Sequence, residues 1–329
     1  MFEWADDLKL RGCDLFFDSR QPRRSCFVSH AHSDHIAVHE RAIATPATAT
    51  LSEHRIGAQN VIQLEYGQSW DFDCDTQLKL LPAGHVVGSA MLHATRPEGS
   101  LLYTGDFKLR ESLTVPQAQP EKADVLVMES TFGKPLFKFP PWRDVAAQLV
   151  DLVEGALRDG RQPIVMGYSL GKAQEAIKIL TSAGLPVTLH GAVHSVAKIH
   201  ETLGVDLGRF RRYAYEDFHG PHAIDLRCRG VLVAPPHVAR SGFVTRFKNP
   251  CRIVLTGWAL FNNAIFRYGV DHALPLSDHA DFNELLEIVE RVEPKKIYTH
   301  HGFPEFADQL RKRGHDAEVA KPDSQLLLF

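Results

Sequence analysis

The sequence predicts an α/β protein in which one domain is built from both ends of the chain and a second α/β domain is inserted between them. Short apolar runs that end on a polar residue fill the first 130 or so residues and return near the end of the chain. In the middle, helical and strand-like segments alternate, as they do in a layered α/β unit. We therefore expect a first domain over residues 1–140 and 276–329 and an inserted domain over 141–275.

The first part of the chain contains short β-type runs that are broken by Gly, Pro and Asp. These runs are CDLFFD, SCFVSH, QLKLLPAGH, SLLYTGD and DVLVMES. In α/β folds, the loops just past the strand ends carry the active-site groups. The polar residues that close these runs are therefore the first candidates for a functional site.

From Pro141 to Pro275 the pattern changes. Helical periodicity is present in WRDVAAQLVDLVEGALRDG and GKAQEAIKILTSAG, and strand-like runs are QPIVMGYS, GVLVAPP and CRIVLTGW. An acidic helix is then expected in DFNELLEIVERVEP, and KKIYTHHG repeats the strand-then-histidine pattern of the first part. Candidate functional residues of the first domain are thus expected again near residue 300.

The composition is that of a globular protein: of 329 residues, 44% are hydrophobic and 23% are charged, with no repeat or low-complexity tract. No apolar run of about 18 residues and no signal-like N-terminus is present, so we expect a soluble, cytoplasmic protein. The five cysteines form no Cys-x-x-Cys pair, which predicts reduced thiols. Because the net charge is -3, any nucleic acid would have to be bound by local charge.

Four candidate metal ligands lie within six residues. His30, His32, Asp34 and His35 form His-x-His-x-Asp-His directly after the apolar run CFVS. On a loop that leaves a strand, side chains two positions apart point the same way, so His30 and His32 should lie on one side. Asp34 and His35 would then point toward a neighbouring position. The segment could therefore bind two adjacent metals. These ligand types favour zinc, with manganese or iron as competing fits. A helix start capped by Ser33 or Asp34 is the alternative, but it explains none of the histidines.

Two further candidates stand alone in the sequence. His85 lies in PAGHVVGS, where Gly84 and Gly88 allow the backbone to turn closely around a site. Asp106 ends the run YTGD, and a carboxylate there can bridge two cations. Taken by itself, each residue has an ordinary structural alternative, such as a turn aspartate. Their order after the His-x-His-x-Asp-His segment is what makes them specific.

This order resembles the metallo-β-lactamase superfamily, whose fold is an αββα sandwich. The chain also resembles the β-CASP nuclease branch, in which a cap domain is inserted late and extra motifs supply an acid, a His and a final His or Val. Glu129 in MESTFG, His279 in LSDHAD and His301 in THHG match these motifs. In combined order, ESTFGKP, YSLGKAQE, HGAV, APP, TGWA, LSDHAD and THHG are similar to the bacterial DNA ligase-associated exonucleases. The resemblance spans nearly the whole chain.

The resemblance implies a pair of divalent metal ions, zinc or alternatively manganese. Carried over residue by residue, it assigns the first metal to His30, His32, His85 and Asp106. It assigns the second metal to Asp34, His35, Asp106 and His301. His300 competes for the last place, but the family pattern puts the ligand directly before glycine, which favours His301.

The expected mechanism follows from these assignments. Two cations about 3.5 to 4 Å apart can share a water, lower its pKa and aim the resulting hydroxide at phosphorus. We expect Asp34 to orient that hydroxide, His279 to act as general acid, and Glu129 to orient a ligand histidine. The alternative for His279 is the start of a capped helix in SDHADFNELL, and both roles can hold at once.

Four cap residues are candidate substrate contacts, because hydroxyls, cations and exposed amides near glycine position phosphates without reading bases. They are Ser169, Lys172, Arg240 and Ser241. An ordinary surface role is the alternative for each of them.

The resemblance implies a DNA exonuclease that acts 5′ to 3′ on single strands in repair, with a DNA ligase and a helicase as partners. The alternative is an RNA-processing enzyme of the RNase J type, because DNA-acting members such as Artemis and Apollo tend to have Asp and Val where this chain has Glu129 and His301. The cap insertion argues against a small-thioester hydrolase, and the complete ligand set argues against a scaffold that binds without cutting.

Overall fold

The computed structural model describes residues 2–4, 7–221, 223–261 and 263–320. The chain forms two compact units. Unit 1 combines Met1–Lys138 with His279–Phe329, and unit 2 is Phe139–Asp278. These bounds lie two and three residues from those expected from the sequence. The predicted fold class, a mixed α/β protein with an inserted α/β part, is confirmed.

The first sheet of unit 1 has the strand order β1-β2-β3-β4-β5-β6. Its first two pairings are antiparallel, and the other three are parallel. The strands are β1 (Phe2–Trp4), β2 (Leu8–Leu10), β3 (Phe16–Phe17), β4 (Ser25–Phe27), β5 (Arg41–Ala44) and β6 (Val61–Gln63). Between β5 and β6 lies α1 (Pro46–Ile56). The Thr45 side chain caps the start of this helix, and a proline occupies its first turn, where no backbone N–H is needed.

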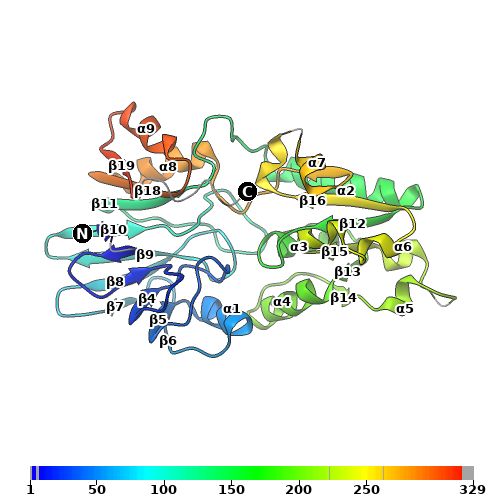
Figure 1. The fold of residues 1–329 in the computed structure, drawn as a ribbon, viewed down its shortest axis with the longest axis horizontal. Coiled ribbons are helices and arrows are strands. Elements are labelled where there is room, and N and C mark those ends of the chain that lie inside the picture. Colours follow the sequence, from blue (N-terminus) through cyan, green and yellow to red (C-terminus); the bar gives the residue numbers. More distant parts are fainter. Residues whose placement is uncertain (1, 5–6, 222, 262, 321–329) are drawn as a thin grey trace. The chain divides into compact units, whose positions relative to one another are not determined.

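The second sheet of unit 1 has the order β19-β18-β11-β10-β9-β8-β7. β7 to β10 form an antiparallel meander, while β10, β11, β18 and β19 are parallel. The strands are β7 (Ser69–Asp71), β8 (Gln77–Pro82), β9 (Ala90–Arg96), β10 (Gly99–Tyr103), β11 (Val125–Ser130), β18 (Lys296–Gly302) and β19 (Ala317–Val319). Figure 1 shows β18 and β19, from the end of the chain, beside β11. Both chain ends are therefore needed to complete this sheet.

The two sheets of unit 1 pack face to face through an apolar core. Side chains from both sheets meet in it, among them Leu10, Phe17, Phe27, Leu80, Leu92 and Tyr103. On the other face of the second sheet, α8 (Phe282–Val292) and α9 (Glu305–Arg311) cover Met128 and its neighbours. The end of α1 packs over the outer face of the first sheet. The layer order is thus helix, sheet, sheet, helix.

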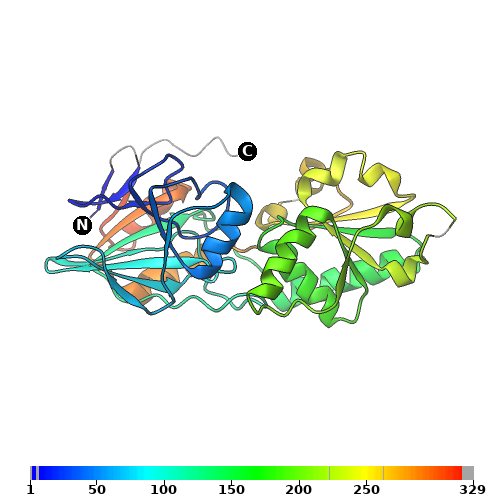
Figure 2. The ribbon, with the colours of Figure 1, turned by 90° about the horizontal axis from the view of Figure 1, so that it is seen from below.

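Unit 2 is built on a parallel sheet of the order β14-β13-β15-β12-β16-β17. The strands are β12 (Gln162–Met166), β13 (Val187–Leu189), β14 (Phe210–Arg212), β15 (Val231–Ala234), β16 (Pro250–Leu255) and β17 (His272–Leu274). The helices are α2 (Trp142–Arg158), α3 (Lys172–Ser182), α4 (Gly191–Thr202), α5 (Tyr215–Phe218), α6 (Leu226–Arg229) and α7 (Ala264–Tyr268), with short 3₁₀ turns at Pro236–Arg240, Val244–Arg246 and Gly257–Leu260. Figure 2 shows helices packed around this sheet.

The described part of the chain contains no helix that is both long enough and apolar enough to cross a lipid bilayer. The cysteines at 13, 26, 74, 228 and 251 are free thiols.

Candidate metal centre

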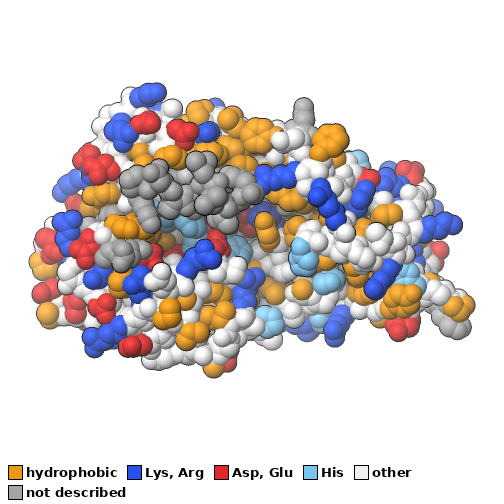
Figure 3. Space-filling model, in the orientation of Figure 1, with side chains coloured by type: hydrophobic (Ala, Val, Ile, Leu, Met, Phe, Trp, Pro, Cys, Tyr) orange, Lys and Arg blue, Asp and Glu red, His pale blue; other side chains and the backbone are white. Residues whose placement is uncertain are grey.

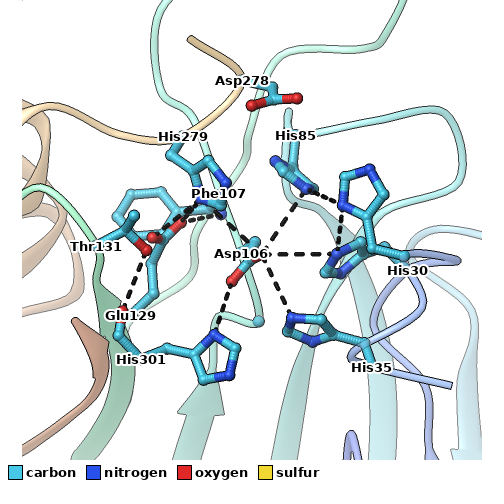
Figure 4. Close-up of polar contacts among 12 residues, drawn as sticks. His30, His35, His85, Asp106, Phe107, Glu129, Thr131, Asp278, His279 and His301 are labelled. Carbon is cyan, nitrogen blue, oxygen red and sulfur yellow. Dashed lines mark hydrogen bonds and ion pairs between the residues drawn. The ribbon is translucent and has the colours of Figure 1, made fainter. Parts of the chain in front are cut away.

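The candidate ligands of unit 1 converge where several strands end, as Figure 4 shows. The His-x-His-x-Asp-His segment begins three residues after β4. His85 follows β8, Asp106 follows β10, and His301 is the next-to-last residue of β18. The topology thus gathers residues that are up to 271 positions apart in the sequence around the Asp106 carboxylate.

A first donor set consists of three imidazoles and a carboxylate. His30 Nε2 and His85 Nε2 each lie 3.1 Å from His32 Nδ1. Asp106 Oδ2 lies 3.6 Å from His30 Nε2 and 3.8 Å from His85 Nε2. Donor atoms at the corners of a tetrahedron around zinc would be about 3.3 to 3.6 Å apart, because zinc bonds are about 2.0 to 2.2 Å long. The set therefore fits a divalent metal of this size.

A second donor set shares Asp106 with the first. His35 Nε2 lies 3.4 Å from Asp106 Oδ2, and His301 Nδ1 lies 3.9 Å from Asp106 Oδ1. Both His35 Nε2 and Asp106 Oδ1 are buried without a hydrogen bond. Since a buried polar atom with no partner is costly, these two atoms indicate a ligand between them. A second cation fits this set.

Asp34 lies at the rim of the second set. Its side chain is 40% exposed, and its Oδ2 is 3.8 Å from His35 Nε2. The structure therefore places this carboxylate beside the converging donor atoms but does not bring it in among them.

A β-bulge sets the direction of His301. β18 pairs Glu129 with His300 and Ser130 with Gly302, so His301 is the extra residue of the bulge. Its φ is +51°, in the left-handed region. A bulge of this kind re-aims one side chain without breaking the sheet.

The bulge gives His300 and His301 different surroundings. The ring of His301 lies 4.9 Å from that of His35, between centroids, whereas His300 stacks on Tyr103 at 5.5 Å. A Cβ at position 302 would lie 1.9 Å from a backbone oxygen, so the bulge requires glycine there. This packing supports His301 as the ligand and explains why glycine follows it.

The electrostatics of the centre follow from burial and from close charges. Burial would raise the pKa of Asp106, but the imidazoles of His35 and His279 outweigh it and hold that pKa well below its usual range. Burial, together with the neighbouring imidazoles, lowers the pKa of His30, which favours the neutral form that binds metals. Burial also lowers the pKa of His301.

Sequence reasoning missed Asp18, which follows β3. Its Oδ1 accepts a hydrogen bond from the Ser29 backbone N–H (2.6 Å), and its Oδ2 accepts one from the Tyr103 hydroxyl (2.7 Å). Asp18 Oδ2 also lies 2.9 Å from His35 Nδ1. That contact leaves His35 Nε2 facing Asp106. The only signal in the sequence is that CDLFFD, like the other runs, ends on a polar residue.

Replacement of Asp18 by Asn is expected to weaken metal binding by about 10- to 100-fold, because the partner that fixes the His35 tautomer is lost. Competition with a metal-binding dye measures the affinity. Asp14→Asn is the matched control, since Asp14 is an exposed aspartate four residues away. Equal affinities for the two variants would contradict the role of Asp18.

Glu129 contacts a different histidine from the one expected. Its side chain is fully buried, and its Oε1 accepts a hydrogen bond from the Phe107 backbone N–H at 2.8 Å. Both carboxylate oxygens lie 3.2 Å from His279 Nδ1. Glu129 therefore orients His279, while the expected contact was with a metal-binding histidine. His279 in turn lies 3.9 Å from Asp106 Oδ2, beside both donor sets.

The charged cap candidates are engaged within unit 2. Lys172 is buried, and its ammonium pairs with the Asp278 carboxylate. Arg240 is exposed, but its Nη2 donates to the carbonyls of Phe266 and Arg267, both at 3.0 Å, at the end of α7. These contacts give both cations a structural role that the sequence did not reveal.

The two serine candidates also have local contacts. The Ser241 hydroxyl donates to the Val238 carbonyl at 2.8 Å. The Ser169 carbonyl accepts from the Gln174 amide at 2.9 Å, in the loop between β12 and α3. Ser169 is thus the candidate whose side chain has the least defined structural role.

The two units differ in charge. Unit 2 contains 16 Lys and Arg against 12 Asp and Glu, whereas unit 1 contains 21 against 28. Basic and acidic side chains are interspersed on the face drawn in Figure 3. By these counts unit 2 is net basic and unit 1 is net acidic.

Comparisons with known proteins place these features in a family. The family model for the Zn-dependent metallo-hydrolase RNA specificity domain matches residues 267–321. A protein of Opitutus terrae named Probable DNA ligase is 38% identical over 329 residues, which cover 99% of this chain and 32% of that protein. RNase aCSPSF2 of Saccharolobus solfataricus is 26% identical, with 90% of this chain and 73% of that protein covered. The chain thus spans about a third of the length of the Opitutus relative.

A crystal structure of a protein of unknown function from Enterococcus faecalis V583 has a TM-score of 0.60 to this chain at 16% identity, with 91% of this chain and 79% of that one covered. At this identity the likeness concerns the fold. The sandwich, the inserted parallel sheet, the donor sets and the sequence relatives agree on one assignment. The chain belongs to the metallo-β-lactamase superfamily, in its β-CASP branch.

Proposed function

We propose that this chain is an exonuclease that hydrolyses the phosphodiester bonds of single-stranded DNA from the 5′ end, in DNA repair. The observation that carries the proposal is the convergence of two donor sets on Asp106. Beside them stands His279, an imidazole that is held by a buried carboxylate. Such a centre combines the parts that phosphodiester hydrolysis needs, which are cation sites and a proton donor.

The proposed cofactors are two zinc ions, with manganese as the alternative. The first would be held by His30, His32, His85 and Asp106, and the second by His35, His301, Asp106 and, at the rim, Asp34. Bound cations of this kind supply Lewis acidity, which polarises the phosphodiester and acidifies water.

The residues around the cation sites have separate tasks. Asp34 orients the attacking water, which a half-exposed carboxylate at the rim can reach. His279 gives a proton to the oxygen that leaves phosphorus. Glu129 contacts His279 at Nδ1, so the ring presents Nε2 for that transfer. Of the cap candidates, Ser169 is the preferred phosphate contact, while Lys172, Arg240 and Ser241 contribute through the loops that they hold.

DNA is the preferred substrate because of a relative that covers nearly the whole chain. The Opitutus protein, which is named as a DNA ligase, matches 99% of this chain at 38% identity. A nuclease and a ligase within one protein would act on the same strand ends, since trimming prepares an end for joining. We therefore include a DNA ligase among the proposed partners. A helicase that exposes single strands is the other.

RNA is the second candidate substrate. RNase aCSPSF2 is 26% identical to this chain, and the matching family model is described as an RNA specificity domain. The motif residues Glu129 and His301 favour the same alternative.

A cleavage assay separates these candidates. Metal-stripped protein is given zinc or manganese and mixed with matched single-stranded DNA and RNA oligonucleotides that carry a label at either end, with or without a 5′-phosphate. We expect stepwise loss of DNA from the 5′ end, only after metal is restored. Preferential cleavage of RNA would favour the second candidate. Cleavage of neither strand would contradict the proposed function.

A further inference from the structure

Two chain segments that carry catalytic candidates are joined by a cluster of hydrogen bonds inside unit 1. The first segment, residues 106–110, starts with the shared ligand Asp106. The second, residues 279–284, starts with His279 and leads into α8. The backbone N–H of Ala280 donates to the Phe107 carbonyl at 2.7 Å, which ties the two segments directly together.

Glu284 is the centre of this cluster. Its Oε1 accepts hydrogen bonds from the backbone N–H groups of Leu109 (2.8 Å) and Arg110 (2.5 Å). Its Oε2 accepts from the backbone N–H of Asp281 (2.9 Å) and from Arg110 Nη1 (2.5 Å). One carboxylate thus holds both segments at once.

Arg110 carries the connection to His279. While its Nη1 contacts Glu284, its Nη2 donates to the His279 carbonyl oxygen at 2.6 Å. His279 is therefore held at two points, by Arg110 at its backbone and by Glu129 at its ring. A guanidinium can make both contacts because its donors form a rigid planar fork, which an ammonium lacks.

We propose that Arg110 and Glu284 form a positioning clamp, which sets His279 relative to Asp106 so that its ring is aligned with the leaving oxygen. The proposal rests on the proposed function. In that reaction the oxygen of water bonds to phosphorus, the bond from phosphorus to O3′ breaks, and O3′ takes a proton from His279, which regains one from solvent. The clamp therefore acts on the proton transfer, through His279, and touches no substrate itself.

Helix capping alone does not explain the clamp. Glu284 and Asp281 form a capping box at the start of α8, which accounts for the contact with the Asp281 N–H. The contacts with residues 109 and 110 serve no helix end. Burial also raises the pKa of Glu284, against the effect of Arg110. Since a buried ion pair is a weak source of stability, a role in fixing geometry accounts better for this one.

The test uses Arg110→Lys and Glu284→Gln in the full chain, with metal content and thermal unfolding measured for each. Glu287→Gln is the matched control, because Glu287 pairs with Arg291 on the same helix and its side chain is 45% exposed. We expect both clamp variants to lose about 10- to 100-fold in kcat on a DNA oligonucleotide, with KM and metal content unchanged. On thymidine 5′-(p-nitrophenyl) phosphate the loss should be about threefold or less, because p-nitrophenolate leaves without a proton.

A double-mutant cycle adds a readout that a purely structural role would not move. In the His279→Asn background, Arg110→Lys should cause no further loss, because residues that act as a unit are not additive. Equal losses on both substrates, additive losses in the cycle, or unchanged kcat would overturn the clamp. If Glu284→Gln does not fold, Arg110→Lys, which keeps the charge, decides the matter.

Failure of the proposed function would look different. In that case the wild-type chain would cut no oligonucleotide. The variants would then be assayed on a series of aryl phosphodiesters whose leaving groups differ in basicity. The clamp then predicts that the variants lose more activity as the leaving group becomes more basic. A loss that is the same across the series would overturn it.

Discussion

Replacement of Asp106 by Asn is expected to lower nucleic-acid cleavage by at least about 10³-fold, since one carboxylate completes both donor sets. Its Oδ2 lies 3.4 Å from His35 Nε2 and 3.6 Å from His30 Nε2, and its Oδ1 lies 3.9 Å from His301 Nδ1. An amide of the same size keeps the shape but provides one neutral oxygen. It can neither bridge two cations nor balance their charge.

The same substitution should also change metal content, which separates a ligand from a residue that only supports the fold. Elemental analysis is expected to show two metals per chain in the wild type and at most one in the purified variant. Asp124→Asn is the control, because Asp124 pairs with Lys295 and Ser100 at the start of β11. An Asp106→Asn variant with full metal content and normal cleavage would disprove the assignment.

The part of the centre that could be predicted from sequence is the part that is local in sequence. His30, His32 and His35 lie on one loop, so their spacing alone indicates a metal site. His85 and Asp106 have no such neighbours, and they were found only because their order matches a family pattern. In the structure, donor atoms of His30, His32, His85 and Asp106 form one group, and those of His35, Asp106 and His301 form another.

The supporting residues could not be found in this way, because their partners are remote. Asp18 contacts His35 across 17 positions, and Arg110 contacts His279 across 169. No local motif marks Arg110, and Asp18 is marked only by its place at the end of the run CDLFFD. Which histidine Glu129 would orient was likewise undetermined, because the choice depends on how β11 and the segment before α8 pack.

Burial and strand register explain the remaining differences between the sequence-based predictions and the structure. Lys172 was a candidate phosphate contact because it follows a glycine, but its ammonium is buried against Asp278. Whether a lysine at a helix start faces solvent depends on which residues pack over it, and the local sequence does not predict this packing. His300 and His301 have the same chemistry, and a single bulge residue in β18 determines which of them faces the metal centre.

Replacement of His279 by Asn is expected to lower kcat on DNA by about 10²- to 10⁴-fold without changing the metal content, because the proposed general acid is lost and the proposed ligands are not. Asn is the informative choice. Its amide can still donate a hydrogen bond to the buried Glu129 carboxylate, so that charge keeps a partner, but it cannot deliver a proton. His54→Asn, at an exposed position of α1, is the control.

Changing the leaving group tests whether the activity lost in His279→Asn is proton transfer. A DNA strand with a 3′-bridging sulfur at the scissile phosphate departs as a thiolate, whose thiol has a pKa of about 8.5 and needs little help from an acid. His279→Asn should therefore cleave this strand at close to the wild-type rate. If the variant remained equally impaired on the sulfur-containing and normal strands, His279 would be a substrate-binding residue, and the proton would have to come from elsewhere in the centre.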